Sequence, residues 1–278
     1  MNAYCLVQIT RLHLQTNPRF CLTFICMNYQ ILEHSNNNRH WIMAFYGYGQ
    51  QAKVYHRLAN LCKGRVGFIV IDLPYHETKQ APSKEDFASF IADLMKRYAI
   101  EKITGISYSI GSRYNLILAE LMPASMVQLI LIAPDGVSIN FWNRVSTSTW
   151  LGQSLFHYLM YHQAFYIKLL TLFHTIHLLP SALYTFSKWH VRNPESSRLV
   201  YQTWMQMKHM IPDLKKINQQ QQLFSFPIKA YFGNKDVIIK PQTSHKLKKE
   251  IPATDIFLID KGHDLLNEEL FPIIASYI

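Results

Sequence analysis

Three residues have the types and the chain order that nucleophilic catalysis requires. Ser109 directly follows an apolar run, and Asp236 and His263 stand at the ends of two later ones. A serine hydroxyl is a weak nucleophile, so it needs a base to take its proton and a third group to orient that base. A single aspartate after a strand is usually a turn residue, and a single Gly-His pair usually lies in a loop without a catalytic role. Their joint occurrence in this order predicts Ser109 as nucleophile, His263 as base and Asp236 as the orienting acid.

The segment around Ser109 predicts a tight turn from a strand into a helix. The run Lys102–Tyr108 leads into the serine, and a helical pattern begins at Ile110. A serine at such a turn sits at a helix N-terminus, where backbone N–H groups and the helix dipole favour developing negative charge. The flanks of the turn must be small because strand and helix come close together. Gly111 meets this need on one flank, and Ser107 stands where glycine would be usual on the other.

Apolar runs without polar alternation predict the strands that position these residues. Such runs are typical of parallel strands buried on both faces. Helical patterns lie between them, one of them opened by a capping-box pair, Ser83 with Asp86. The alternation predicts an α/β fold with a mainly parallel central sheet flanked by helices, and residues 20–32 are expected to add antiparallel strands. The expected parallel strands are Trp41–Tyr46, Val66–Ile71, Lys102–Tyr108, Val127–Ala133, Ile228–Phe232 and Asp255–Ile259.

A long helical block interrupts this alternation before the last two strands. From about residue 138 to 222 no strand pattern occurs, and apolar residues cover more than one helical face. The polar run Gln219–Gln222 is expected to be a linker back to the sheet. We therefore predict a core formed by residues 1–137 and 223–278, with a helical cap, or lid, formed by residues 138–222.

The cap is rich in aromatic residues and poor in charge. Between Val145 and Ser187 the only formally charged residue is Lys168. The aromatics suggest an apolar pocket for an acyl or aromatic substrate, although we expect about two-thirds of them to pack within the cap. With the net charge of +10, the cap also raises the hypothesis of peripheral contact with an anionic membrane. The aromatics are Phe141, Trp142, Trp150, Phe156, Tyr158, Tyr161, Phe165, Tyr166 and Phe173.

Composition and charge limit the class of protein, its partners and its location. A chain of 278 residues, of which 17% are charged, suits one globular core and not a disordered or fibrous protein. The basic residues are scattered without interleaved aromatics, so no nucleic-acid partner is expected. No secretory signal and no run of eighteen apolar residues are found, which leaves a cytoplasmic location by elimination.

Cysteines and histidines show no metal-ligand spacing. The cysteines form no CxxC pair and are expected to be free thiols, as in a reducing compartment. The cap histidines have no acidic residue nearby to complete a ligand set. No metal and no cofactor are therefore expected. The residues concerned are Cys5, Cys21, Cys26 and Cys62, and His157, His162, His174 and His177.

Several further motifs resemble those of the α/β-hydrolase superfamily, and the match covers most of the chain outside the first forty residues and the cap. Tyr46-Gly47-Tyr48-Gly49 is similar to the family's His-Gly segment after its third strand, and Asp72-Leu73-Pro74-Tyr75-His76 to its Asp-x-Pro-Gly-x-Gly loop. Leu131-Ile132-Ala133-Pro134 resembles the strand end before the lid, and the order Ser, Asp, His is the one that this fold uses. The resemblance implies that the backbone N–H groups of Tyr48 and Ile110 form an oxyanion hole.

The chain departs from the family pattern at several positions. Ser107 replaces the first elbow glycine, Tyr46 the usual histidine, and Tyr75 and Glu77 small loop residues. Tyr46 would either add a hydroxyl donor near the oxyanion hole or pack in the core, and we expect packing. A serine at position 109 is unlike the aspartate of epoxide hydrolases and haloalkane dehalogenases.

These features predict a serine hydrolase that cleaves an ester-like bond of a fairly apolar substrate through an acyl-enzyme. The same machinery serves thioesters, lactones, amides, carbon–carbon bonds and acyl transfer, and fold and triad do not choose among them. The alternative is a non-catalytic protein of the same fold that binds an apolar small ligand or a membrane lipid.

Overall fold

The computed structural model describes residues 27–34, 39–73, 82–138 and 141–278. The strands are β1 (Tyr29–Glu33), β2 (His40–Phe45), β3 (Gly67–Ile71), β4 (Lys102–Tyr108), β5 (Met126–Ile132), β6 (Ile228–Gly233) and β7 (Asp255–Ile259). The helices are α1 (His56–Leu61), α2 (Lys84–Arg97), α3 (Ser112–Leu121), α4 (Phe141–Ser148), α5 (Trp150–Tyr161), α6 (Gln163–Thr175), α7 (Ser181–His190), α8 (Pro194–Met207), α9 (Leu214–Phe224), α10 (Thr243–Glu250) and α11 (Leu270–Ala275).

The seven strands form one sheet in the order β1-β3-β2-β4-β5-β6-β7. All neighbouring pairs are parallel except β1 with β3, which is antiparallel. The six predicted parallel strands are confirmed to within one residue at each end. The predicted antiparallel addition is present as β1, while residues 20–26 lie outside the described part of the chain. The runs in β2 to β5 lack polar alternation because these strands are central and almost wholly buried.

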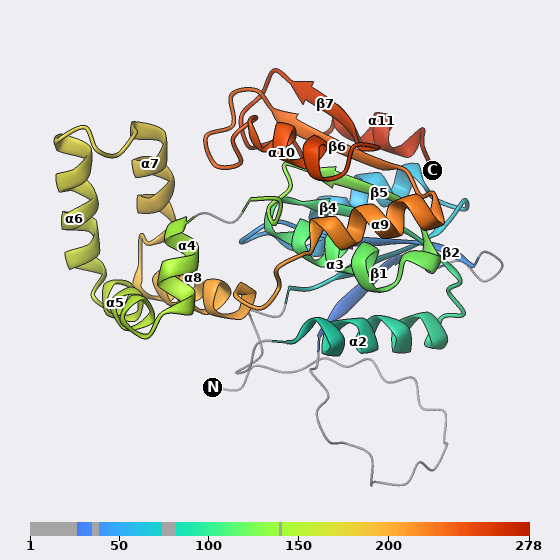
Figure 1. Ribbon diagram of the computed structural model, residues 1–278, viewed down its shortest axis with the longest axis horizontal. Coiled ribbons are helices and arrows are strands. Elements are labelled where there is room, and N and C mark those ends of the chain that lie inside the picture. The colour runs from blue at the N-terminus through green and yellow to red at the C-terminus, as the bar shows by residue number, and fades with distance from the viewer. Residues whose placement is uncertain (1–26, 35–38, 74–81, 139–140) are drawn as a thin grey trace, which may run out of the picture.

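Helices α2, α3, α9 and α10 pack in a row, and α1 packs against α11 (Figure 1). The predicted capping box opens α2, where the Ser83 hydroxyl accepts from the Asp86 N–H and the Asp86 carboxylate accepts from the Ser83 N–H. Buried Glu120 on α3 links the starts of α2 and α9 through hydrogen bonds. Its carboxylate accepts from Lys84 Nζ at 2.7 and 2.9 Å and from the Asp213 N–H at 3.0 Å.

The prediction of a linker at Gln219–Gln222 is wrong, because these residues lie within α9. Asp213 caps this helix by accepting from the N–H groups of Lys215 and Lys216. Leu214 and Ile217 are buried, and α9 packs against α3. Burial of these two apolar residues and the N-cap at Asp213 therefore stabilise a helix whose middle is a run of polar residues.

Helices α4 to α8 form a separate cluster between β5 and β6 in the chain (Figure 1). Buried Arg113 of α3 joins this cluster to the core, because its Nε donates to Asp135 at 2.9 Å and its Nη1 to the Met207 carbonyl at 3.1 Å. The division of the chain into a core and a cap at residues 138 and 222 remains a prediction.

Candidate active site

The three residues predicted for catalysis meet at the carboxyl edge of the sheet. Ser109 follows β4, Asp236 follows β6 and His263 follows β7, and parallel strands end at the same edge. His263 Nδ1 lies 2.6 Å from Asp236 Oδ2, and His263 Nε2 lies 3.0 Å from Ser109 Oγ. The structure thus brings a hydroxyl, an imidazole and a carboxylate into one chain of hydrogen bonds.

Ser109 stands on a strained turn, as the sequence predicts. Its φ is 51°, a left-handed conformation that costs a non-glycine residue about 1–3 kcal/mol. A 3-10 turn over Ser109–Gly111 leads into α3, and the Ser109 carbonyl accepts from the Asp135 N–H at 3.1 Å. The turn projects the serine from the end of the strand, at the N-terminus of a helix.

Gly111 allows the turn to lie against the end of β2. A Cβ at this position would be 2.5 Å from the Tyr46 carbonyl oxygen and 2.6 Å from the Phe45 carbonyl oxygen. Both are backbone atoms that cannot rotate away. This close contact with the backbone explains why a small residue is needed at this flank, as the sequence predicts.

We expect Gly111→Ala to lower the free energy of unfolding by about 1–3 kcal/mol, because the methyl group overpacks this contact. Gly262→Ala is the control, since the nearest atom to a Cβ there is 4.0 Å away. Urea unfolding followed by circular dichroism measures both. Equal losses in the two variants would contradict the contact argument.

Asp236 is held so that one carboxylate oxygen faces the imidazole. The side chain is buried, and its Oδ1 accepts from the N–H groups of Ile238 and Ile239 at 2.8 and 2.9 Å. Oδ2 is left for His263. Because an ionised carboxylate only accepts, Nδ1 carries the hydrogen and Nε2 is free to accept from Ser109.

Tyr108 supports the histidine from the elbow, which the sequence analysis missed. Its hydroxyl donates to the His263 carbonyl at 2.8 Å, and the two rings lie 5.3 Å apart. Burial raises the pKa of the Tyr108 hydroxyl, so it stays a donor across the neutral range. Tyr108 is the last residue of β4 and directly precedes the candidate nucleophile, but no local pattern indicates its partner.

The two residues proposed as oxyanion donors lie in adjoining turns. The turn after β2 is closed by the Gly47 N–H, which donates to Gln50 Oε1 at 2.9 Å, and by the Gln50 N–H, which donates to the Gly47 carbonyl. Tyr48 lies in this turn, and Ile110 follows Ser109 in the elbow. Contact of Gly111 with the end of β2 brings the turns together. Their role as donors remains a proposal.

Tyr46 is a packed residue, as expected. It is buried, its hydroxyl donates to Asp72 Oδ1 at 2.9 Å, and it accepts from the Leu73 N–H at 3.4 Å. The hydroxyl thus holds the start of the loop after β3 by hydrogen bonds. Ser107 is buried within β4, opposite Phe45 and Leu131. Tyr75 and Glu77 lie outside the described residues.

A residue of the α4 to α8 cluster lies beside Tyr48. His190, the last residue of α7, has its ring 5.1 Å from the Tyr48 ring. Its Nδ1 is 2.8 Å from the Phe186 carbonyl. Burial lowers the pKa of His190, and the charges of Arg192 and His263 lower it further. Nothing in the sequence pairs the end of α7 with the turn after β2, so this contact was not predicted.

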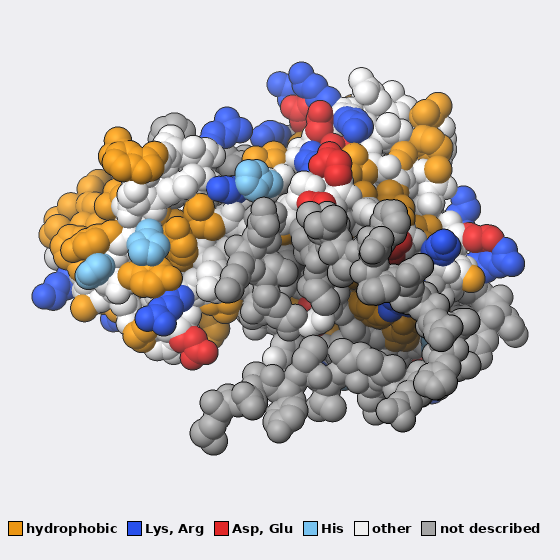
Figure 2. Space-filling model, turned by 90° about the horizontal axis from the view of Figure 1, so that it is seen from below, with side chains coloured by type: hydrophobic (Ala, Val, Ile, Leu, Met, Phe, Trp, Pro, Cys, Tyr) orange, Lys and Arg blue, Asp and Glu red, His pale blue; other side chains and the backbone are white. Residues whose placement is uncertain are grey.

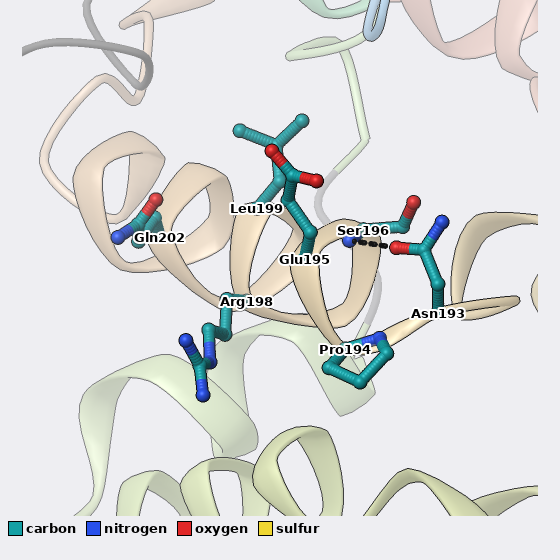
Figure 3. Close-up of a pocket in the computed structure, with 7 residues that line it drawn as sticks. All are labelled: Asn193, Pro194, Glu195, Ser196, Arg198, Leu199 and Gln202. Atoms are coloured by element: carbon teal, nitrogen blue, oxygen red, sulfur yellow. Dashed lines mark hydrogen bonds between the residues drawn. The ribbon is translucent and has the colours of Figure 1, made fainter. Parts of the chain in front are cut away.

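A cavity of about 840 Å³ lies away from these residues, along the first half of α8 (Figure 3). Two of its polar side chains already have structural partners. Asn193 Oδ1 accepts from the Ser196 N–H and caps the helix, and the Arg198 guanidinium lies over the Tyr161 ring. Within the described ranges no three His, Cys, Asp or Glu side chains are grouped to hold a metal ion. The hydrogen-bonded Ser109, His263 and Asp236 remain the candidate active site.

Comparison with solved structures shows the fold. The chain superposes on MGS-M2, an α/β-hydrolase from a deep-sea metagenome library of the Medee basin, at a TM-score of 0.63 and 12% identity over 90% of this chain and 92% of that one. A carboxylesterase structure from Nitrososphaera gargenis superposes at a TM-score of 0.60 and 16% identity, over 90% of this chain and 93% of that one. MenH from S. aureus superposes at a TM-score of 0.61 and 18% identity, over 90% of this chain and 97% of that one. No protein-family model and no curated protein matches the sequence.

Proposed function

From the α/β-hydrolase fold, which this chain has, we propose that it is a serine hydrolase that cleaves a carboxylic ester through an acyl-enzyme. The observation that carries the proposal is the continuous chain of hydrogen bonds from Ser109 through His263 to Asp236. A buried aspartate that orients an imidazole against a serine on a strained turn has its clearest chemical use in activating that serine.

In the proposed reaction Ser109 Oγ attacks the ester carbonyl while His263 Nε2 takes its proton. The Tyr48 and Ile110 N–H groups stabilise the oxyanion, each by about 3–4 kcal/mol in comparable enzymes. His263 then donates the proton to the leaving alcohol, and the acyl group stays on Ser109. Water, activated by the same imidazole, hydrolyses this intermediate. No step requires a metal or a cofactor.

The substrate we propose has a fairly apolar acyl part. Apolar cap helices and the Tyr48 and His190 rings near the candidate site support this. The Nitrososphaera relative in fold is described as a carboxylesterase, which supports the ester class. A membrane surface, as a peripheral partner of the cap, would hold such substrates.

A series of p-nitrophenyl esters from acetate to octanoate tests the proposal. We expect kcat/KM to rise about fourfold for each added methylene until the pocket is full, because each buried CH₂ contributes about 0.8 kcal/mol. Hydrolysis that is fastest for acetate would contradict the apolar substrate. Saturable binding of a fatty acyl ligand with no turnover of any ester would favour the non-catalytic alternative.

A further inference from the structure

The surface of the cap is unusually apolar. Trp150 is 78% exposed and Leu151 72%, and Leu155, Phe165, Leu172 and Ile176 are each at least half exposed. Figure 2 shows hydrophobic side chains gathered over this end of the molecule, with basic side chains beside them. Of the nine cap aromatics named from the sequence, seven have side chains that the structure describes, and five of these are exposed, namely Trp150, Tyr158, Tyr161, Phe165 and Phe173. The expectation that about two-thirds of them pack within the cap is therefore wrong.

The exposed groups belong to the outer sides of short helices. The inner side of α5 packs on α8, where the Phe156 ring lies 5.4 Å from the Tyr201 ring, so Trp150, Leu151 and Leu155 face outward. On α6 the exposed Lys168 stands three residues after Phe165. A lysine within an apolar stripe can extend its ammonium past the stripe to an acidic surface.

The formal charges carried by α5, α6 and α7 all have one sign. From residue 150 to 190 the sequence has no Asp or Glu, and its formal charges are Lys168 and Lys188. Arg192 adds a third, with its guanidinium 4.2 Å from the centre of the exposed Trp189 ring. Two copies of this face would bring like charges together, whereas an anionic surface would attract them.

The helices suit a position along a membrane and not through it. Among the described helices none is long and apolar enough to cross a bilayer. With 12 and 13 residues, α5 and α6 are roughly 20 Å long, against a hydrocarbon core of about 30 Å. Helices with an apolar outer side and flanking basic residues lie at the interface of lipid and water.

We infer that the cap face, defined by the outer sides of α5, α6 and α7, docks on an anionic lipid bilayer. Its leucines and aromatic rings enter the interface, and Lys168, Lys188 and Arg192 bind lipid phosphates. The same α7 ends at His190 beside Tyr48, so docking would place the candidate site at the bilayer. Delivery of substrate by this route rests on the proposed function, but the docking does not.

Flotation of the full chain with vesicles tests the docking, using phosphatidylcholine alone and a 7:3 mixture with phosphatidylserine. The double variant Leu151→Ser/Leu155→Ser should bind the mixed vesicles about tenfold or more weakly than wild type. The control is Leu223→Ser/Leu258→Ser on α9 and β7, because these leucines are 74% and 59% exposed, against 72% and 59% in the cap. This control pair should bind within about twofold of wild type.

Lys168→Gln should weaken binding to the mixed vesicles about fivefold and leave binding to neutral vesicles unchanged. Ser109→Ala should bind as wild type does, so a failure of docking and a failure of catalysis are distinguishable. Equal losses in the two leucine pairs, or no binding by folded wild type at low salt, would overturn the inference. The inference would also be overturned if sedimentation showed a wild-type dimer that only Leu151→Ser/Leu155→Ser dissociates, while vesicle binding by this variant stayed unchanged.

Discussion

Replacing Ser109 with alanine should lower kcat for ester hydrolysis about a million-fold and leave the fold intact. The variant keeps the binding surface but has no nucleophile for His263 to activate, and such a loss removes nearly all triad catalysis. Kinetics on the best ester of the chain-length series measures the effect, with circular dichroism to verify folding. Ser197→Ala, at a buried serine of α8, is the matched control and should keep wild-type kcat.

A loss of less than about tenfold in Ser109→Ala would show that another group performs the chemistry. The remaining activity would then be traced by mapping the acylated peptide. If the Ser197→Ala control lost activity equally, the effect would be structural.

Asp236→Asn should lower kcat about ten-thousand-fold with little change in KM. The amide is close in size to the carboxylate, so its oxygen can still accept from the Ile238 and Ile239 N–H groups. Its NH₂ would then donate to His263 Nδ1, so the ring hydrogen would move to Nε2. Nε2 could then no longer accept the proton of Ser109.

Asp260→Asn is the control, because Asp260 is an exposed aspartate near the end of β7 that pairs with Lys235. This variant should keep activity within about twofold. An Asp236→Asn variant that retained wild-type kcat would mean that the imidazole is oriented without the carboxylate.

Features with a local signal were predicted well from the sequence. Parallel strands such as β4 and β5 are mostly buried on both faces and so lack polar alternation, and the apolar runs indicated them to within a residue. The elbow was visible because a left-handed serine needs a close-packed small residue such as Gly111 nearby. Asp236 and His263 could be named as candidates because each lies shortly after the end of a strand.

Features that depend on distant partners were not predictable. Tyr108 binds the His263 carbonyl across 155 residues of sequence, and His190 reaches Tyr48 from the end of a cap helix. The mistaken linker in α9 has the same origin, since its glutamines are compatible with a helix and burial of Ile217 stabilises it. The apolar composition of the cap did not show which of its faces are buried.

Fluorophosphonate labelling of the wild-type chain, followed by mapping of the modified peptide, tests the central proposal most directly, because it requires no knowledge of the substrate. An activated serine should be labelled at Ser109, and labelling should disappear in both Ser109→Ala and His263→Ala. Folded wild-type protein that stays unlabelled, also when detergent is added to open access to the site, would contradict an activated serine and favour a non-catalytic ligand-binding protein.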